Sequence, residues 1–123
     1  MLTPIAYVLA VVLVLFVVFI GIWFLTAPQP ASKAYGVPAK PDGDTAYLTI
    51  KGLRDLTSGI IGLTLLAFAD ADAAGLYMLA LSVAPFGDTI IVLRHGGAKF
   101  TAFGVHFSSA IAILVSAGLL FAA

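Results

Sequence analysis

The sequence contains no cysteine, no glutamate and few charged residues of any kind. The lack of cysteine excludes disulfide bonds, thiolate chemistry and zinc–thiolate sites. Only 10% of the residues are charged and 62% are hydrophobic, whereas soluble domains average about 25% charged and about 45–50% apolar residues. A soluble protein of this length needs more polar groups to cover its surface. We therefore expect one integral membrane domain over residues 1–123, surrounded mainly by lipid.

Several functional classes lack their usual signals in this chain. The formal net charge is zero, so no basic surface points to nucleic acid. The sequence has no Walker loop, no dinucleotide-binding glycine pattern, no G-x-S-x-G elbow and no H-E-x-x-H motif. Its two histidines, His95 and His106, are too few and too far apart for a tightly held metal or a shared haem. We expect no metal and no cofactor.

Long apolar stretches occupy most of the chain, and each can cross a hydrocarbon core of about 30 Å. Residues 27–45 separate the first two and are rich in proline and glycine, including Pro28, Gly36 and Pro41, which favours a loop. Short connections between the other stretches imply antiparallel neighbours. The sequence predicts an all-α fold, an up-down four-helix membrane bundle, with spans over about residues 4–26, 46–69, 73–93 and 100–121.

The basic residues indicate the orientation of these spans. Lys33 and Lys40 lie in the first connection, and Arg94 and Lys99 lie in or beside the third. The second connection and both ends of the chain carry no lysine or arginine. By the positive-inside rule, loop 27–45 and the third connection face the cytoplasm and both termini face outside. We expect the protein in the plasma (inner) membrane.

Ionisable and polar residues inside the predicted spans are costly in lipid and are candidates for function. With a helical rise of about 1.5 Å per residue, Arg54, Asp55, Asp88 and His106 fall at one level, roughly 5–8 Å below the cytoplasmic boundary. In the second span, three- and four-residue steps place the polar residues on one face. The expected polar layer comprises Lys51, Arg54, Asp55, Ser58, Asp88 and His106.

Two pairings within this layer are compatible with helical phase and depth. Arg54 is the natural ion-pair partner for Asp88, and Asp55 could orient His106. One interpretation is a structural tie in which Arg54 reaches the headgroups and Asp88 neutralises it. The other is a ligand or reaction site that opens toward the cytoplasmic leaflet, with Asp55, Asp88 and His106 as candidate catalytic residues. An oligomer contact or an ion pathway is also open.

Proline and small residues mark helix bends and helix contacts. Pro85 should kink the third span near Asp88, because it removes a backbone hydrogen bond to Leu81. Small residues let helices pack closely, and they recur in the second span and, every four residues, in the fourth. The predicted helix-packing residues are Gly59, Gly62, Gly104, Ser108, Ala112 and Ser116.

The segment Lys51-Gly52-Leu53-Arg54-Asp55-Leu56, with Ser58-Gly59-Ile60 and Gly62 after it, carries a family resemblance. Together with Asp88 and His106, it resembles the small membrane proteins grouped as domain of unknown function 4267, which are distantly similar to DoxX-like four-helix proteins. The resemblance implies a four-span bundle and an importance of the Gly-x-Arg-Asp segment, Asp88 and His106. It implies no reaction.

Two functional hypotheses therefore stand side by side. The first is a site that binds or transforms a small, lipid-soluble molecule at the polar layer. The second is a non-catalytic structural or accessory subunit that self-associates, or joins a membrane complex, through its small-residue helix faces. Transport is disfavoured, because one shallow layer of charges gives no continuous polar path.

Overall fold

We analysed a computed structural model of the chain, which describes residues 2–40 and 43–123. Those residues form helices connected by short turns, without strands. The expected all-helical class is thus confirmed for the described residues. Pro41, which we assigned to the first loop, lies outside the described residues. The helices are α1 (Leu2–Thr26), α2 (Pro28–Tyr35), α3 (Thr45–Phe68), α4 (Ala71–Leu81), α5 (Val83–Arg94), the π-helix η1 (Phe100–Phe107) and α6 (Ser108–Ala122).

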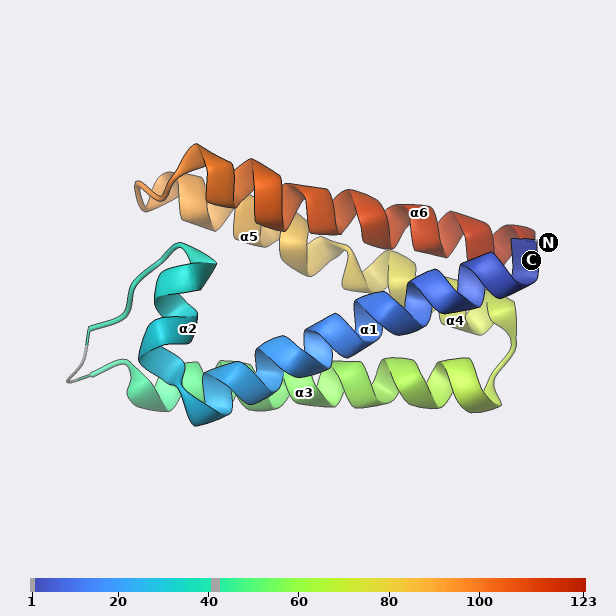
Figure 1. Cartoon of the computed structure of the whole chain (residues 1–123), viewed down its shortest axis with the longest axis horizontal. Coiled ribbons are helices and arrows are strands. Elements are labelled where there is room, and N and C mark those ends of the chain that lie inside the picture. Colours follow the sequence, from blue (N-terminus) through green and yellow to red (C-terminus); the bar gives the residue numbers. More distant parts are fainter. Residues whose placement is uncertain (1, 41–42) are drawn as a thin grey trace.

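Four helical rods run along the length of the molecule (Figure 1). They are α1, α3, α4 followed by α5, and η1 followed by α6. Both termini lie at the same end, and α2 lies at the opposite end (Figure 1). Three rods are long and apolar enough to span a membrane: Leu2–Thr26, Ala71–Arg94 and Phe100–Ala122. The rod formed by α3 is not among them; it carries Lys51, Arg54 and Asp55 in its first half.

The rods differ from the expected spans in two places. The third rod is broken at Ser82, and Pro85 lies in the first turn of α5, where a missing backbone N–H costs little. The fourth rod begins as eight residues of π-helix before it continues as α6. A π-helix holds more residues per turn than an α-helix, so side chains before and after residue 108 do not keep one α-helical phase.

The connection that we expected to be a loop contains the helix α2. Pro28 begins it, and proline is favoured in a first turn because its fixed φ suits the helix. Gly36 ends it with φ 108°, in the left-handed region that glycine adopts readily. The Gly36 N–H donates to the Ser32 carbonyl, 3.2 Å away, and closes the helix. The start and stop residues are therefore the proline and glycine that we read as loop signals.

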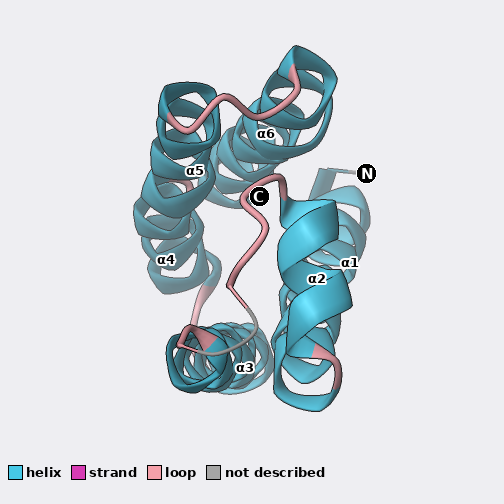
Figure 2. Cartoon of the chain, turned by 90° about the vertical axis from the view of Figure 1, so that its left-hand side faces the viewer, coloured by secondary structure: helices cyan, strands magenta, loops and turns pink. Residues whose placement is uncertain are grey.

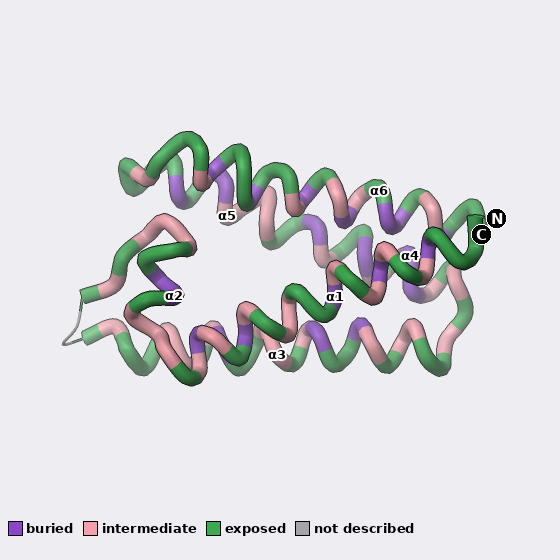
Figure 3. The backbone as a smooth tube through the Cα atoms, in the orientation of Figure 1, coloured by how far each residue is buried: buried purple, intermediate pink, exposed green. Residues whose placement is uncertain are grey.

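The apolar core lies toward the end that holds the termini, between α1, α4 and α6 (Figure 3). Most other large apolar side chains are exposed on the outside of the molecule, including Phe68 at 88% and Phe100 at 80%. An outer surface so rich in exposed aliphatic and aromatic groups suits a lipid environment. The buried core residues are Ala6, Ala10, Val14, Ala74, Met78, Ile113, Ala117 and Leu120.

Close approach of α1 and α3 depends on glycines from both helices. A Cβ on Gly21 would lie 2.5 Å from the Leu56 backbone nitrogen, and one on Gly52 would lie 2.8 Å from the Gly21 carbonyl oxygen. Gly59 and Gly62 of α3 face Val18 and Val14 of α1. No other pair of helices packs over so long a contact. This packing fixes the α1–α3 pair, while α1 and α6 separate toward the α2 end (Figure 1).

Candidate functional site

A cavity of about 390 Å³ lies inside the molecule, with residues from every helical rod and from α2 in its wall. Viewed from the α2 end, α2 lies in front of α1, and the loop that follows it passes in front of the region between the rods (Figure 2). Most of the wall is apolar and includes Phe16, Phe19, Trp23 and Phe24 from α1. Its polar members are Tyr35, Lys51, Asp55, Ser58, Asp88, His106 and Ser109.

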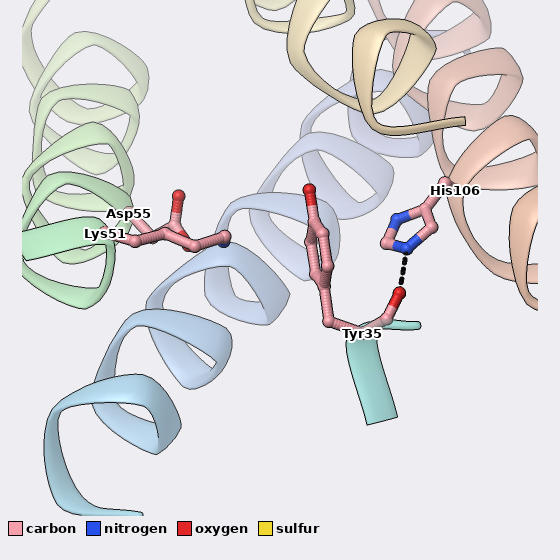
Figure 4. Close-up of polar contacts among 4 residues, drawn as sticks. All are labelled: Tyr35, Lys51, Asp55 and His106. Carbon is pink, nitrogen blue, oxygen red and sulfur yellow. Dashed lines mark hydrogen bonds and ion pairs between the residues drawn. The ribbon is translucent and has the colours of Figure 1, made fainter. Parts of the chain in front are cut away.

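Lys51 and Asp55 form an ion pair on the cavity side of α3. They are four residues apart in the helix, and the Lys51 Nζ lies 2.6 Å from an Asp55 carboxylate oxygen. The same ammonium group lies 4.3 Å from the centre of the Phe24 ring and 4.6 Å from that of Tyr35. The carboxylate neutralises the ammonium, and the two ring faces attract it. Lys51 therefore points inward and is fully engaged (Figure 4).

His106 connects η1 to the end of α2. Its side chain is buried, and its Nε2 lies 2.6 Å from the Tyr35 carbonyl oxygen (Figure 4). That carbonyl is available because the last carbonyls of a helix have no partner within the helix. A carbonyl oxygen only accepts hydrogen bonds, so Nε2 must carry the hydrogen. In neutral His106, the lone pair is therefore on Nδ1, which has no protein hydrogen-bond partner among the described residues.

Tyr35 contributes its ring and its hydroxyl to the cavity. Its ring centre lies 4.4 Å from that of His106, and 5.9 Å from that of Phe24 in an edge-to-face contact. Its hydroxyl lies beside the Asp88 carboxyl. Burial raises the pKa of Tyr35 above its ordinary range, and the neighbouring carboxyl groups of Asp88 and Asp55 raise it further. Tyr35 is thus a neutral hydroxyl throughout the physiological pH range.

Asp88 lies on α5, one turn after the break between α4 and α5. Pro85 is three residues earlier, and the Pro85 carbonyl accepts a hydrogen bond from the Thr89 hydroxyl at 2.8 Å. Asp88 lines the cavity. Among the described residues it forms no ion pair, because Lys51 pairs with Asp55. The carboxyl group of Asp88 therefore lies beside the neutral Tyr35 hydroxyl without an ion pair of its own, although Lys51 and His106 are close enough to interact with it electrostatically.

The structure brings together most of the polar layer that the sequence predicts, but with different partners. Lys51, Asp55, Ser58, Asp88 and His106 line the cavity, whereas Arg54 is exposed and lies outside it. The expected ion pair of Arg54 with Asp88 is not found among the described residues. Arg54 lies at the edge of the polar face of α3, and its long side chain extends outward.

The expected orientation of His106 by Asp55 is likewise replaced. Asp55 pairs with Lys51, one helical turn before it, and His106 donates to the Tyr35 carbonyl. Sequence reasoning missed Tyr35, because it lies in a connection read as a loop. Pro28 at the start and Gly36 at the end of that segment are a helix signal that could have located it.

The small residues that we predicted to form one packing face on the last rod differ in their exposure. Gly104 and Ser108 are exposed, Ala112 is half-buried and Ser116 is buried. The change from exposed Ser108 to buried Ser116 occurs within the α-helix α6, as this helix runs into the core that it forms with α1 and α4. The π-helix alters only the position of Gly104 relative to the residues after it. The exposed part of this face is therefore limited to the neighbourhood of Gly104 and Ser108.

Comparison with known proteins places the chain in a family without giving a reaction. The sequence profile of a family described as "Domain of unknown function (DUF4267)" matches residues 14–120. The chain belongs to this family. The match covers all residues of the cavity wall except Leu13. No curated protein and no solved structure gives a match.

The arrangement offers hydrogen-bonding and charged groups rather than a metal centre. Within residues 2–40 and 43–123, no three His or Asp side chains gather closely enough to hold a metal ion. The cavity presents a neutral hydroxyl from Tyr35, an imidazole nitrogen from His106 and the carboxyl group of Asp88. These groups can hold the polar end of a bound molecule and can exchange protons with it.

Proposed function

We propose that this protein crosses the membrane four times and binds a small, largely apolar molecule in the cavity near its cytoplasmic side. The single observation that carries the proposal is the composition of the cavity wall. Aromatic and aliphatic side chains make up most of it, and polar groups from α2, α3, α5 and η1 converge at one end. Small-molecule sites have this combination of apolar surface and a few converging polar groups, and volumes of about 300–1,000 Å³.

The rim of the cavity supports entry of the molecule from the lipid. Phe16 and Phe19 of α1 and Val105 of η1 line the cavity and are also 47%, 56% and 37% exposed. These residues come from α1 and from η1 of the last rod, and α1 and the last rod separate toward the α2 end (Figure 1). In a membrane, such an apolar rim faces acyl chains. A lipid-soluble molecule can then reach the polar groups without passing through water.

The polar end also gives the site a capacity for acid–base chemistry. The Tyr35 hydroxyl can donate a hydrogen bond to a bound molecule, and Nδ1 of neutral His106 can accept a proton from it. Asp55, Asp88 and His106 remain the candidate catalytic groups of this proposal. Arg54 is no longer part of it, because its side chain lies outside the cavity.

Self-association as an accessory subunit is the second candidate function. It is favoured by the exposed Gly104 and Ser108 on the last rod, because small exposed residues allow a second helix to approach closely in lipid. We also propose that the chain is distantly similar to DoxX-like four-helix proteins. This function and ligand binding use different surfaces, so one protein can have both.

Trp23 makes the cavity directly measurable, because it is the chain's one tryptophan and lines the cavity wall. TEMPO, a small, neutral, apolar nitroxide, quenches tryptophan fluorescence at short range. In phosphatidylcholine nanodiscs we expect TEMPO to quench Trp23 with a saturable component. Ala84 lines the cavity but is exposed, so Ala84→Phe adds a bulky ring at the cavity rim and should weaken or remove that component.

Ala80→Phe is the matched control, because Ala80 is exposed one turn earlier and lies outside the cavity. It should leave saturable quenching as in the unsubstituted protein. If quenching rises linearly with TEMPO concentration and is equal in all three proteins, TEMPO reaches Trp23 only from the bilayer. That result would overturn the proposed binding function.

A further inference from the structure

We propose that the molecule bound in the cavity is a lipophilic amine whose ammonium group lies against the Asp88 carboxylate. This inference rests on the proposed function and adds the chemical class of the ligand. It is drawn from the charges that line the cavity, from the hydrogen-bonding groups that remain free there, and from the aromatic surface around them.

When Asp88 is ionised and His106 is neutral, the groups that line the cavity carry one more negative than positive charge. Its titratable groups are Tyr35 from α2, Lys51 and Asp55 from α3, Asp88 from α5 and His106 from η1, while α1 contributes none. Lys51 and Asp55 neutralise each other at 2.6 Å. With His106 neutral, the remaining formal charge is that of Asp88. A cationic ligand therefore balances the cavity, whereas a carboxylate or phosphate would add a second uncompensated negative charge in a low-dielectric region.

The groups left free at the polar end are mainly acceptors. Lys51 is occupied by Asp55 and two aromatic rings, and the Nε2–H of His106 is occupied by the Tyr35 carbonyl. The Asp88 carboxylate and the Nδ1 atom of His106 both accept hydrogen bonds. An ammonium group brings several donors and no acceptor, so it suits this set. Charge-assisted hydrogen bonds of this kind are among the strongest that proteins make.

Aromatic rings provide the second feature that an ammonium group requires. The Lys51 ammonium already lies over the Phe24 and Tyr35 rings, at 4.3 and 4.6 Å from their centres. Trp23 and Phe19 extend this aromatic surface along α1 toward the rim. A second ammonium can use the same attraction to ring faces while its apolar part contacts the aliphatic wall. The cavity thus fits a cation with an apolar body.

A series of nitroxides that differ in one substituent tests the charge preference. 4-Amino-TEMPO is cationic at neutral pH, 4-hydroxy-TEMPO is neutral and 4-carboxy-TEMPO is anionic, with the same ring in all three. We expect 4-amino-TEMPO to half-saturate the quenching of Trp23 at a concentration about tenfold or more below that of either other probe, as one charged hydrogen bond provides. Nanodiscs of zwitterionic phosphatidylcholine and subtraction of the quenching measured in Ala84→Phe correct for partitioning into lipid.

Two variants test whether Asp88 is the residue that causes the preference for the cationic probe. Asp88→Asn should bring 4-amino-TEMPO to the level of 4-hydroxy-TEMPO, whose own saturable quenching shows that the variant cavity is intact. Asp72→Asn removes an exposed carboxylate in the first turn of α4, outside the cavity, and should change nothing.

Even if Asp88→Asn does not fold, comparison of the three nitroxides in the unsubstituted protein tests whether the cavity prefers a cation. Equal or weaker binding of 4-amino-TEMPO, with saturable binding of 4-hydroxy-TEMPO, would overturn the amine inference and leave the proposed function standing. A preference that persists in a folded Asp88→Asn protein would overturn the role of Asp88. If none of the three probes saturates, both the inference and the proposed function fail.

Discussion

At the scale of single residues, the bond between His106 and the Tyr35 carbonyl holds α2 against the rest of the molecule. It joins positions 71 residues apart in the chain, and both partners lie in the cavity wall. When a buried carbonyl group loses its hydrogen-bond donor, the folded protein loses stability. At an exposed carbonyl, water can take the place of the donor. The same bond also fixes which imidazole nitrogen faces the cavity, so one contact serves both the fold and the site.

Two substitutions of His106 distinguish the contribution of its hydrogen bond from that of its ring. In glutamine the side-chain amide reaches about as far as Nε2, and in asparagine only about as far as Nδ1. We expect His106→Asn to lower the free energy of unfolding by about 1–3 kcal/mol, because the Tyr35 carbonyl loses its donor. His106→Gln should retain a large part of that stability. Thermal unfolding in one detergent, followed by Trp23 fluorescence, measures both variants.

Equal destabilisation by the asparagine and glutamine variants would contradict this account of His106, because the donor position would then not matter. If His106 were a purely functional group, its truncation would leave the stability nearly unchanged. The hydrogen bond to Tyr35 changes that expectation.

At the scale of helices, the sequence predicts the rods well and their irregular parts poorly. Long runs without charge define α1 and the last rod, because lipid tolerates few alternatives to a helix. The cavity residues Lys51, Asp55 and Ser58 also follow from simple three- and four-residue spacing on α3. We predicted a kink at Pro85, near Asp88; in the structure the rod is interrupted at Ser82, and Pro85 lies in the first turn of the next helix.

Three features escaped prediction because they depend on contacts between distant segments. The helix α2 lies in a proline-rich connection, and its end is held by His106 from the other end of the chain. The last rod begins as a π-helix, and its exposure changes along α6, from exposed Ser108 to buried Ser116, as α6 enters the core. The direction of Arg54 at the edge of a polar face depends on its neighbours, which one sequence does not specify.

Packing of α1 on α3 gives a prediction at the same scale. In Gly21→Ala, the new methyl group would lie 2.5 Å from the Leu56 backbone nitrogen and 2.8 Å from the Gly52 carbonyl oxygen. Backbone atoms cannot move aside as a side chain can, so the two helices must separate. We expect a loss of about 1–3 kcal/mol in the free energy of unfolding, as is typical of overpacked contacts.

Gly118→Ala on α6 is the matched control for that substitution. A Cβ at Gly118 would have no neighbour within 4 Å, and alanine in a helix interior is favoured over glycine by about 0.5–1 kcal/mol. Gly118→Ala should therefore unfold at the same or a higher temperature than the unsubstituted protein. A Gly21→Ala protein as stable as the Gly118→Ala protein would show that α1 and α3 are not packed this closely.

At the scale of the whole molecule, all six basic residues lie toward the α2 end and the core lies toward the termini. Lys33, Lys40, Arg94 and Lys99 are in α2 or in the connections, and Lys51 and Arg54 are in the first half of α3. In the orientation that we propose from the positive-inside rule, the α2 end is cytoplasmic and the cavity lies close to that side of the membrane. A cavity enclosed by four membrane-spanning rods requires α3 to cross the membrane as well. The three charged residues of α3, Lys51, Arg54 and Asp55, lie within five positions of one another, and α3 is not among the three rods that are apolar enough to span by composition.

Whether α3 crosses the membrane is therefore the most direct test, and the lack of native cysteine makes the chain a ready background for it. Gly43→Cys, Asp72→Cys, Ala98→Cys and Ala123→Cys each place one thiol at an exposed position in or near a connection or at the C-terminus. In right-side-out vesicles, a membrane-impermeant maleimide should label Asp72→Cys and Ala123→Cys. It should reach Gly43→Cys and Ala98→Cys only after the vesicles are permeabilised. Labelling of Gly43→Cys and Asp72→Cys from the same side would mean that α3 does not cross, and would contradict a cavity enclosed by four membrane-spanning rods.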